Sequence, residues 1–507
     1  MSSTPNSIAP EPSLPEPTPF ANGECQAGPN EEFQTNSATL ETRESADISA
    51  TTPSSAAKTP VRGASLRWNF SWTFVGNVIY SGCQWAMLVV LAKIGNPEMV
   101  GQYGLAMAVA TPVLALSTLQ LRAVLTTDVR KRIHFGEYLG FRLLTTLLSL
   151  MVIGAIAVVM RYPGLFGGMF AGRTHYSRDS TWVILIVGVA QALEIVSDLY
   201  YARMQFYEHM DRIAKSMIAR GALGLAAMGA GVYLTHSVIW GALGLTLARA
   251  LVMLTYDIRR RTHLQPHRAS ETKQGREVQE AAQESLRPRW NASVQMELLR
   301  TSITLGVIAM LVSLLPNIPR YFIAGSQGER ALGIFTATAF LVSSGNLIIN
   351  SLGQSAFVRL AKHYAAGDVR EFNSLLLKLV GIAAVLGLGG IGVAVLFGRL
   401  LLTLLYRPEY AEHTDVLIAM MVGGAVTYVA GLMASAVTAA RCFVRQIPLL
   451  VTAVASAAIA SKILVPTHGL LGAAFAVIIT STVLCAGEVV LLWSVLRNVS
   501  SPVAAEG

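Results

Sequence analysis

The residues of this sequence that could do chemistry are a few charged and amide side chains inside long apolar segments. The basic members are Lys93, Arg122, Arg142, Arg249, Arg320 and Arg359. Arginine binds phosphate through two parallel hydrogen bonds, so arginines that face a cavity would suit a phosphate or an acidic sugar. We expect Lys93, Arg122, Arg249 and Arg320 to bind substrate. The alternative, contact with lipid headgroups, would explain Lys93 and Arg359.

Two acidic residues, Glu194 and Asp198, lie four positions apart and therefore on one face of a helix. A carboxylate pair in a low-dielectric site can carry a proton or a sodium ion. We predict an ion-coupling site for H⁺ or Na⁺ at this pair. Alternatively, either carboxylate could simply neutralise Arg249.

Three amide side chains, Asn346, Asn350 and Gln354, recur every four residues. This spacing places them on one helical face, where exposure to lipid would be costly. They are candidates for substrate binding in a wet cavity, and hydrogen bonding to a neighbouring helix is the equal alternative.

Other motifs are weaker. The segment GLGGIG, residues 387–392, matches a dinucleotide-binding pattern, but it lies within an apolar segment, where close helix packing is the better explanation. The four cysteines lack the spacing of a metal site, and no Walker A motif occurs. We expect no catalytic residues, no metal and no cofactor, and hence no enzyme.

The elements that must position these residues follow from composition. The chain is 53% hydrophobic and 14% charged, and several apolar runs exceed the ~18 residues that can cross a bilayer. The net charge of +9 is typical of cytoplasmic loops of a membrane protein, and we expect no nucleic acid partner.

The predicted fold is all-α and polytopic, with about twelve membrane-spanning helices in two six-helix lobes. The expected spans are 72–94, 99–121, 138–160, 181–201, 213–234, 237–256, 300–323, 331–357, 374–397, 415–437, 446–464 and 470–495. The expected domains are a disordered tail (1–60), an N-terminal lobe (61–256), a polar linker (257–298), a C-terminal lobe (299–497) and a short tail (498–507). Arginines and lysines in alternate loops predict that both termini and the linker face the cytoplasm.

An internal repeat supports the two lobes. VGQYGLAMAVATP and LGIFTATAFLVSS align Gly101 with Gly333 and Tyr103 with Phe335. Since six helices separate the copies, the lobes share one orientation and form a parallel repeat, as in carriers that rock between inward-open and outward-open states.

The chain resembles bacterial polysaccharide biosynthesis proteins, the O-antigen-type flippases of the multidrug/oligosaccharidyl-lipid/polysaccharide exporter superfamily. The resemblance rests on WNFSWTFVGNVIYSGCQWAMLVVLAKIGNPEMVGQYGLAMAVATP, LGIFTATAFLVSSGNLIINSLGQSAFVRLAKHYAAGD, LLTLLYRPEYAEH and LVPTHGLLGAAFAVIITS, and runs from about residue 65 to 497. It implies a cationic lumen to which Lys93, Arg122 and Arg320 contribute.

The resemblance implies a flippase that moves undecaprenyl-pyrophosphate-linked oligosaccharide to the periplasmic leaflet of the bacterial inner membrane. Its implied partners are this lipid-linked substrate, membrane lipids, and a polysaccharide polymerase and glycosyltransferases. A cation-coupled drug or small-solute antiporter of the same superfamily is the alternative. A non-transporting scaffold is a third possibility, in which the tail and the linker would be the interacting parts.

Overall fold

The computed structural model describes residues 66–127, 133–162, 177–207, 209–259, 287–440 and 443–500, and its regular structure over these residues is helical. The acidic tail 1–60, most of the linker, Cys25 and Cys442 lie outside the described residues. The helices of the N-terminal lobe are α1 (Leu66–Ile94), α2 (Pro97–Thr118), α3 (Leu121–Thr127), α4 (Phe135–Arg161), α5 (Arg178–Phe206), α6 (Met210–Thr235), α7 (Val238–Val252) and the π-helix η3 (Met253–Asp257). Those that follow are α9 (Ala292–Leu314), α10 (Ile318–Ser326), α11 (Gly328–Ala365), α12 (Val369–Leu405), α13 (Pro408–Ala411), α14 (Thr414–Ala439) and α15 (Phe443–Ser500).

Eleven helices of the described chain are long and apolar enough to cross a membrane. The last of them, in α15, contains two spans, because Gly469 breaks it with φ 64° and ψ −135°. A Cβ added at Gly487 would overlap the Leu449 side chain, so the two halves of α15 pack against each other as a hairpin. The prediction of about twelve membrane-spanning helices is therefore confirmed.

The predicted repeat appears in space as a contact between α2 and α11. A Cβ added at Gly101 would overlap the carbonyl oxygen of Glu329, and one added at Gly333 would overlap that of Pro97. These two contacts are equivalent, because Glu329 lies four residues before Gly333 and Pro97 lies four residues before Gly101. A pseudo-two-fold axis therefore passes between Gly101 and Gly333, where the absence of side chains lets the backbones touch.

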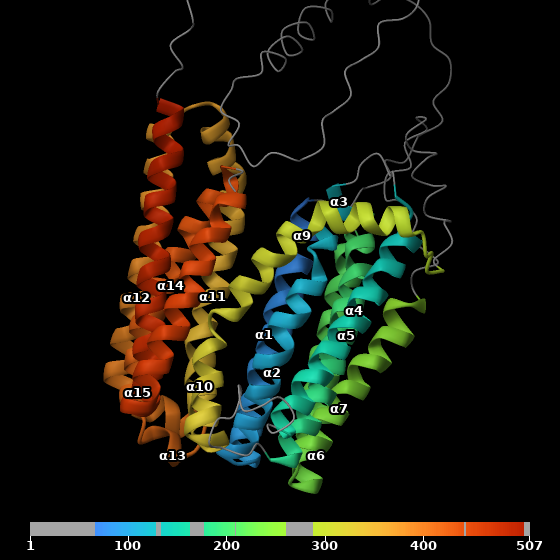
Figure 1. Cartoon of the computed structure of the whole chain (residues 1–507), viewed down its shortest axis with the longest axis vertical. Helices are drawn as coiled ribbons and strands as arrows, with labels where there is room; N and C mark the ends of the chain where they lie inside the picture. Colours follow the sequence, from blue (N-terminus) through green and yellow to red (C-terminus); the bar gives the residue numbers. More distant parts are fainter. Residues whose placement is uncertain are drawn as a thin grey trace, which may run out of the picture.

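The lobes touch at one end of the molecule and diverge toward the other (Figure 1). We call the end at which α2 and α11 begin the closed end, and the end at which α1 begins the open end. The first halves of both α2 and α11 are buried. In contrast, most side chains in the first half of α1, and those on several faces of α11 from Ser343 onward, are exposed.

Polar contacts join the lobes at the closed end. Glu329 on α11 accepts hydrogen bonds from Gln102 Nε2 (2.7 Å), from Ser177 N (3.3 Å) and from Ser180 Oγ. Beside it, Arg330 pairs with Glu98 of α2 at 3.6 Å.

Helix α9 connects the lobes at the open end (Figure 1). Asn291 caps its start, and Leu298 packs among buried residues of α2 to α5. Residues 292–298, expected to be part of the linker, thus form the first turns of a helix on the N-terminal lobe. The segment then breaks at residues 315–317, because Pro316 and Pro319 cannot donate backbone hydrogen bonds, and continues as α10.

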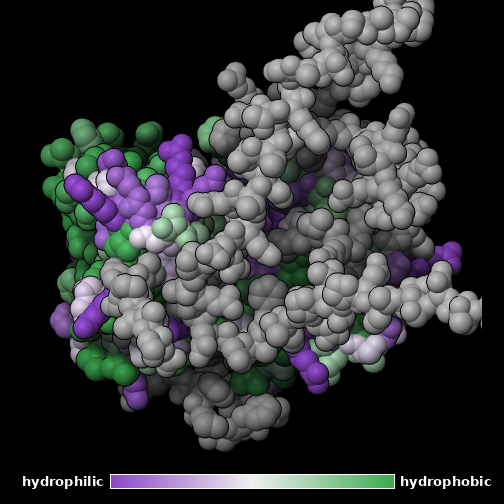
Figure 2. All heavy atoms as spheres, turned by 90° about the horizontal axis from the view of Figure 1, so that it is seen from above, coloured by the Kyte–Doolittle hydropathy of each residue, from purple (hydrophilic) through white to green (hydrophobic). Residues whose placement is uncertain are grey.

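The outer surface suits a bilayer. Leu377, Val385, Leu388 and Leu396 of α12 are exposed, as expected for lipid-facing side chains. Viewed from the open end, hydrophilic side chains gather over the end of the C-terminal lobe and hydrophobic ones surround its flank (Figure 2). The GLGGIG segment lies within α12. Gly387 packs closely against Ala425 of α14, as expected for helix packing, whereas a Cβ added at Gly389 or Gly392 would meet nothing within 4 Å.

Candidate functional site

Three arginine–carboxylate pairs lie inside the N-terminal lobe. In the first, the buried Arg249 of α7 forms an ion pair with Glu194 of α5 at 2.9 Å and also donates to Gln191. Tyr80 of α1 donates its hydroxyl proton to Glu194 and accepts a bond from Gln84 Nε2 at 2.8 Å. The alternative in which a carboxylate neutralises Arg249 therefore matches the structure.

The second pair is Arg122 with Asp198, the second acid of the predicted ion-coupling site. Arg122 is in the first turn of α3, which follows a sharp bend at Leu119 and Gln120, both with positive φ. Its Nη1 contacts Asp198 Oδ1 at 2.7 Å, and its Nε and Nη2 donate to Gln205 Oε1 at 3.0 and 2.8 Å. Both charged side chains are about one third exposed, at 37% and 36%.

The third pair, Arg220 with Asp257, was not predicted. Arg220 Nη2 of α6 lies 2.6 Å from Asp257 Oδ2, and both side chains are almost completely buried. Ser216 donates to Asp257 at 2.5 Å and exchanges a hydrogen bond with the Tyr201 hydroxyl at 2.8 Å. The π-helix turn of η3 carries Asp257 into this position. The signal available in the sequence was an arginine inside an apolar segment.

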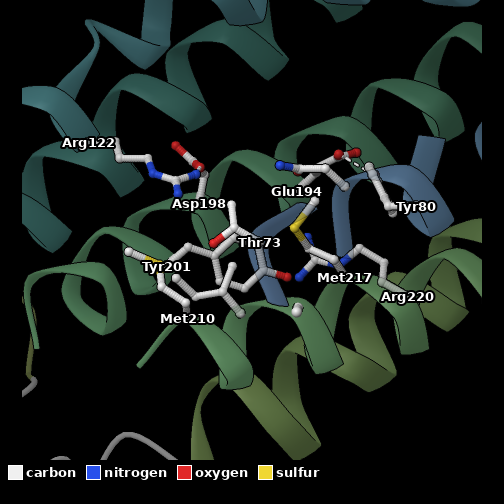
Figure 3. A pocket seen from close by; sticks show the side chains of 12 residues that line it. Thr73, Tyr80, Arg122, Glu194, Asp198, Tyr201, Met210, Met217 and Arg220 are labelled. Carbon is white, nitrogen blue, oxygen red and sulfur yellow. Dashed lines mark hydrogen bonds and ion pairs between the residues drawn. The ribbon is translucent and has the colours of Figure 1, made fainter. Parts of the chain in front are cut away.

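A cavity of about 150 Å³ lies between α1, α5 and α6, next to these pairs. Its lining side chains converge from separate helices (Figure 3). The charged lining residues are Arg122, Glu194, Asp198 and Arg220. On the α1 side it is bounded by Thr73 and Asn77, which are exposed, so the cavity lies next to the unpacked half of α1. The cavity therefore presents both guanidinium and carboxylate groups to a ligand.

Two further arginines are buried without a carboxylate partner among the described residues. Arg142 of α4 is 0% exposed, and its Nη1 donates to the Ser117 carbonyl at 3.1 Å. Arg320 of α10 is 9% exposed, and its Nη1 donates to Asn317 Oδ1 at 3.2 Å. In both residues the buried Nε has no hydrogen-bond acceptor. Neither guanidinium group has a carboxylate within ion-pair distance among the described residues.

The other predicted residues lie elsewhere. Lys93 is exposed at the closed end, far along α1 from the cavity, and its carbonyl oxygen accepts a bond from Arg407 Nη2 at 3.1 Å. The structure thus does not bring Lys93 together with Arg122. Asn346 is half-buried, whereas Asn350 and Gln354 are exposed, and none bonds to another described residue. They lie in the half of α11 beyond its contact with α2.

No group of three metal-ligating side chains occurs within the part of the chain that the structure describes. The two described cysteines, Cys83 and Cys485, are free and half-buried. The cavity side chains of Arg122, Glu194, Asp198 and Arg220 offer hydrogen bonding and ion pairing to a ligand.

Comparisons with known proteins agree with this architecture. No protein-family model matches the chain. It is 25% identical over 417 residues, 82% of its length, to the capsular polysaccharide biosynthesis protein CapF of Staphylococcus aureus, of which it covers 96%. The resemblance to polysaccharide biosynthesis proteins, which the sequence indicated, is thereby confirmed.

Solved structures show the same fold. The inward-facing conformation of a multidrug resistance MATE family transporter of the MOP superfamily matches with a TM-score of 0.65 at 15% identity, over 85% of this chain and 100% of that one. The lipid II flippase MurJ in an inward closed conformation matches with a TM-score of 0.57 at 11% identity, over 85% of this chain and 89% of that one. The chain is a multi-pass membrane protein with the two-lobe fold of these transporters and flippases, which are not enzymes.

Proposed function

We propose that this protein is a flippase that moves an undecaprenyl-pyrophosphate-linked oligosaccharide from the cytoplasmic to the periplasmic leaflet of the bacterial inner membrane, for surface polysaccharide synthesis. Both termini and the linker face the cytoplasm in this proposal, so the open end receives the substrate there. Two lobes that touch at one end and diverge at the other support alternating access.

The observation that carries the proposal is that Arg142 and Arg320 are buried and form no ion pair with any carboxylate of the described residues. A buried charge without a partner is strongly unfavourable, so its presence calls for an anionic group that visits it. Arg320 lies in the first turn of a broken helix, and such half-helix N-termini face anionic groups in other carriers. A pyrophosphate is an anion that suits such donors.

The remaining predicted residues have roles consistent with this substrate. Asn346, Asn350 and Gln354 offer donors and acceptors to sugar hydroxyls in the unpacked half of α11. Arg122 and Arg249 are already paired with carboxylates, so their contribution to a positive lumen is smaller than expected from the sequence. Lys93, at the closed end, would meet the substrate only as it leaves. The polyprenyl chain would stay in the bilayer.

The experiment is translocation of a fluorescent polyprenyl-pyrophosphate-linked oligosaccharide in proteoliposomes, with leaflet-selective quenching as readout. Arg320→Met should lower the rate at least about tenfold, the effect of losing a charge-assisted phosphate contact. It should also raise the unfolding temperature, because an unpaired buried charge is removed. Arg497→Gln, which removes an exposed guanidinium stacked on Trp493, is the control.

An unchanged rate with Arg320→Met would contradict the proposed role of Arg320. No movement of the glycolipid by the wild-type chain would contradict the function itself. The competing candidate, a cation-coupled drug or small-solute antiporter, is favoured by the carboxylates Glu194 and Asp198 in the cavity. It predicts that a lipophilic cation, and not the glycolipid, is moved.

A further inference from the structure

The chain that leads into α9 lies in a groove at the start of α4. A Cβ added at Gly136 would overlap the carbonyl oxygen of Arg287. One added at Gly140 would overlap the carbonyl oxygen of Arg289, whose own N–H donates to the Gly136 carbonyl at 2.9 Å. The two glycines are one helical turn apart and share a face, so their missing side chains make room for this backbone. We call residues 287–290 the strap.

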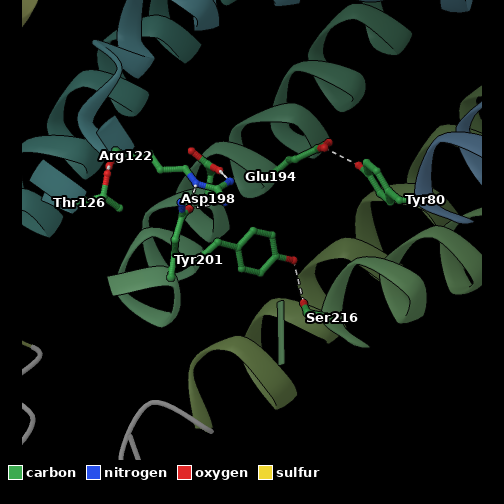
Figure 4. Close-up of polar contacts among 8 residues, drawn as sticks. Tyr80, Arg122, Thr126, Glu194, Asp198, Tyr201 and Ser216 are labelled. Carbon is green, nitrogen blue, oxygen red and sulfur yellow. Dashed lines mark hydrogen bonds and ion pairs between the residues drawn. The ribbon is translucent and has the colours of Figure 1, made fainter. Parts of the chain in front are cut away.

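The side chains of the strap are directed away from the lobe. All four of its residues are exposed, and Trp290 is 62% exposed. Arg287 and Arg289 form no ion pair with a described residue, whereas the guanidinium group of Arg122 is directed at Asp198 (Figure 4). Arginine and tryptophan are side chains that membrane proteins place among phospholipid headgroups, because each combines an apolar body with a polar end.

The face of α4 that holds the strap continues as an apolar stripe. Leu144, Leu148 and Met151 continue the spacing of the two glycines, and they therefore lie on the same side of the helix. These three side chains, the α4 stripe, are 45%, 60% and 65% exposed, although α4 is long and apolar enough to cross a membrane. In a bilayer, acyl chains cover such a surface. The strap therefore lies where the headgroup of a lipid on this stripe would be.

Helix α9 continues from the strap across the open end of the N-terminal lobe (Figure 1). Leu298 is buried in the lobe, whereas Met296, on the opposite side of the helix, is 48% exposed. Two further exposed residues, Glu297 and Arg300, carry opposite charges. The net positive charge of this surface is thus that of the strap.

We propose that the strap and the α4 stripe form a binding site for one anionic phospholipid. The lipid phosphate contacts Arg287 and Arg289, the acyl chains cover the stripe, and Trp290 lies in the headgroup layer. The lipid holds the strap in its groove and thereby keeps the start of α9, the helix that joins the lobes, on the N-terminal lobe. It is a resident lipid and not the transported one, because no residue of this site lines the cavity between α1, α5 and α6.

The probe is phosphatidylglycerol with bromine at the glycerol end of its acyl chains, titrated into the purified full chain in detergent. Bromine quenches nearby tryptophan, and the share of Trp290 is obtained by repeating each titration with Trp290→Phe added. The double variant Arg287→Gln/Arg289→Gln should bind the lipid about twenty-fivefold more weakly, or about fivefold for each arginine. Brominated phosphatidylcholine, which has no net charge, should bind wild type with a similarly low affinity.

Two matched controls separate a positioned site from charge alone. Gly140→Ala places a methyl group against the Arg289 carbonyl oxygen, so it should displace the strap and weaken phosphatidylglycerol binding about fivefold although both arginines remain. Gly154→Ala on the same helix should bind as wild type, because a Cβ there meets no atom closer than 4.0 Å. Arg359→Gln/Arg370→Gln, which removes two exposed arginines of the C-terminal lobe, should also bind as wild type.

Equal affinity of wild type and the Arg287→Gln/Arg289→Gln variant for phosphatidylglycerol would overturn the proposal. Equal affinity of wild type for phosphatidylglycerol and phosphatidylcholine would overturn it as well. Farnesyl pyrophosphate, added as a competitor, should not displace the bound lipid. Displacement at equal concentration would show that the strap receives a polyprenyl pyrophosphate instead, which would overturn the resident-lipid site and leave the flippase proposal standing.

Discussion

Tyr321 of α10 donates its hydroxyl proton to the carbonyl oxygen of Ala108 in α2. The acceptor is free because Pro112, four residues further along α2, has no backbone N–H to bond it. A proline in one lobe thus creates an acceptor that a tyrosine of the other lobe uses, at the contact that must break when the closed end opens.

Removing this hydrogen bond should shift the equilibrium toward opening of the closed end. Tyr321→Phe deletes the donor and keeps the ring, so about 1 kcal/mol of preference for the closed form should be lost, or about fivefold in population. Spin labels at Thr235 and Thr467, exposed positions of the two lobes, would report the distance. Tyr233→Phe, at an exposed tyrosine of α6, is the control, and identical distance distributions would refute the prediction.

Glu329 should stabilise the closed end more than Arg330 does. Its carboxylate accepts hydrogen bonds from Gln102, Ser177 and Ser180 of the other lobe, whereas the Arg330 pair with Glu98 is longer and exposed. Glu329→Gln should shift the free-energy difference between the closed and open forms by about 1–2 kcal/mol in favour of the open form. Arg330→Gln should shift it by less than about 1 kcal/mol. The same label pair measures both. A larger effect of Arg330→Gln would reverse this ranking.

The facing glycines should tolerate no side chain. Gly333→Ala would place a methyl group against the Pro97 carbonyl oxygen, so the lobes could not close as observed. We expect translocation to fall by more than about tenfold and the short-distance population of the label pair to disappear. Gly389→Ala is the matched control, because a Cβ there meets nothing within 4 Å. Normal closure with Gly333→Ala would exclude a tight contact at this point.

The buried pair Arg220–Asp257 should contribute more to the free energy of unfolding than an exposed ion pair does. Asp257→Asn leaves Arg220 charged and almost completely buried, which should destabilise the chain by about 3–5 kcal/mol. Thermal unfolding in detergent measures this. Asp211→Asn breaks an exposed pair with Lys215 and should cost less than about 1 kcal/mol. Equal losses from the two substitutions would mean that burial of the pair has no energetic effect.

Much of the fold could be predicted because each part of it depends on local sequence. A span is recognisable from about twenty consecutive apolar residues, since every backbone polar group in a bilayer must bond within its own helix. The duplicated lobe was visible in the glycines at 101 and 333, whose spacing survives in the chain even where side chains differ. The break of α15 at Gly469 left a similar signal, a short polar turn between two apolar runs.

The site was less accessible to such reasoning. The sequence identified Arg122, Arg249, Glu194 and Asp198 as unusual inside apolar segments, because each is expensive there without a partner. Which arginine meets which carboxylate depends on how α3, α5 and α7 pack, and Arg220 with Asp257 escaped notice for the same reason. Lys93 was predicted as a substrate-binding residue on the same grounds, but it lies at the closed end, away from the cavity.

The amino-acid sequence by itself thus determined that this chain crosses a membrane about twelve times in two related lobes, because hydrophobicity and repetition act along the chain. Only the tertiary structure decided which buried arginines form ion pairs and which, Arg142 and Arg320, have no carboxylate partner within the described part of the chain. Electrostatic energy depends on distances between atoms far apart in sequence, and those distances exist only once the helices are packed.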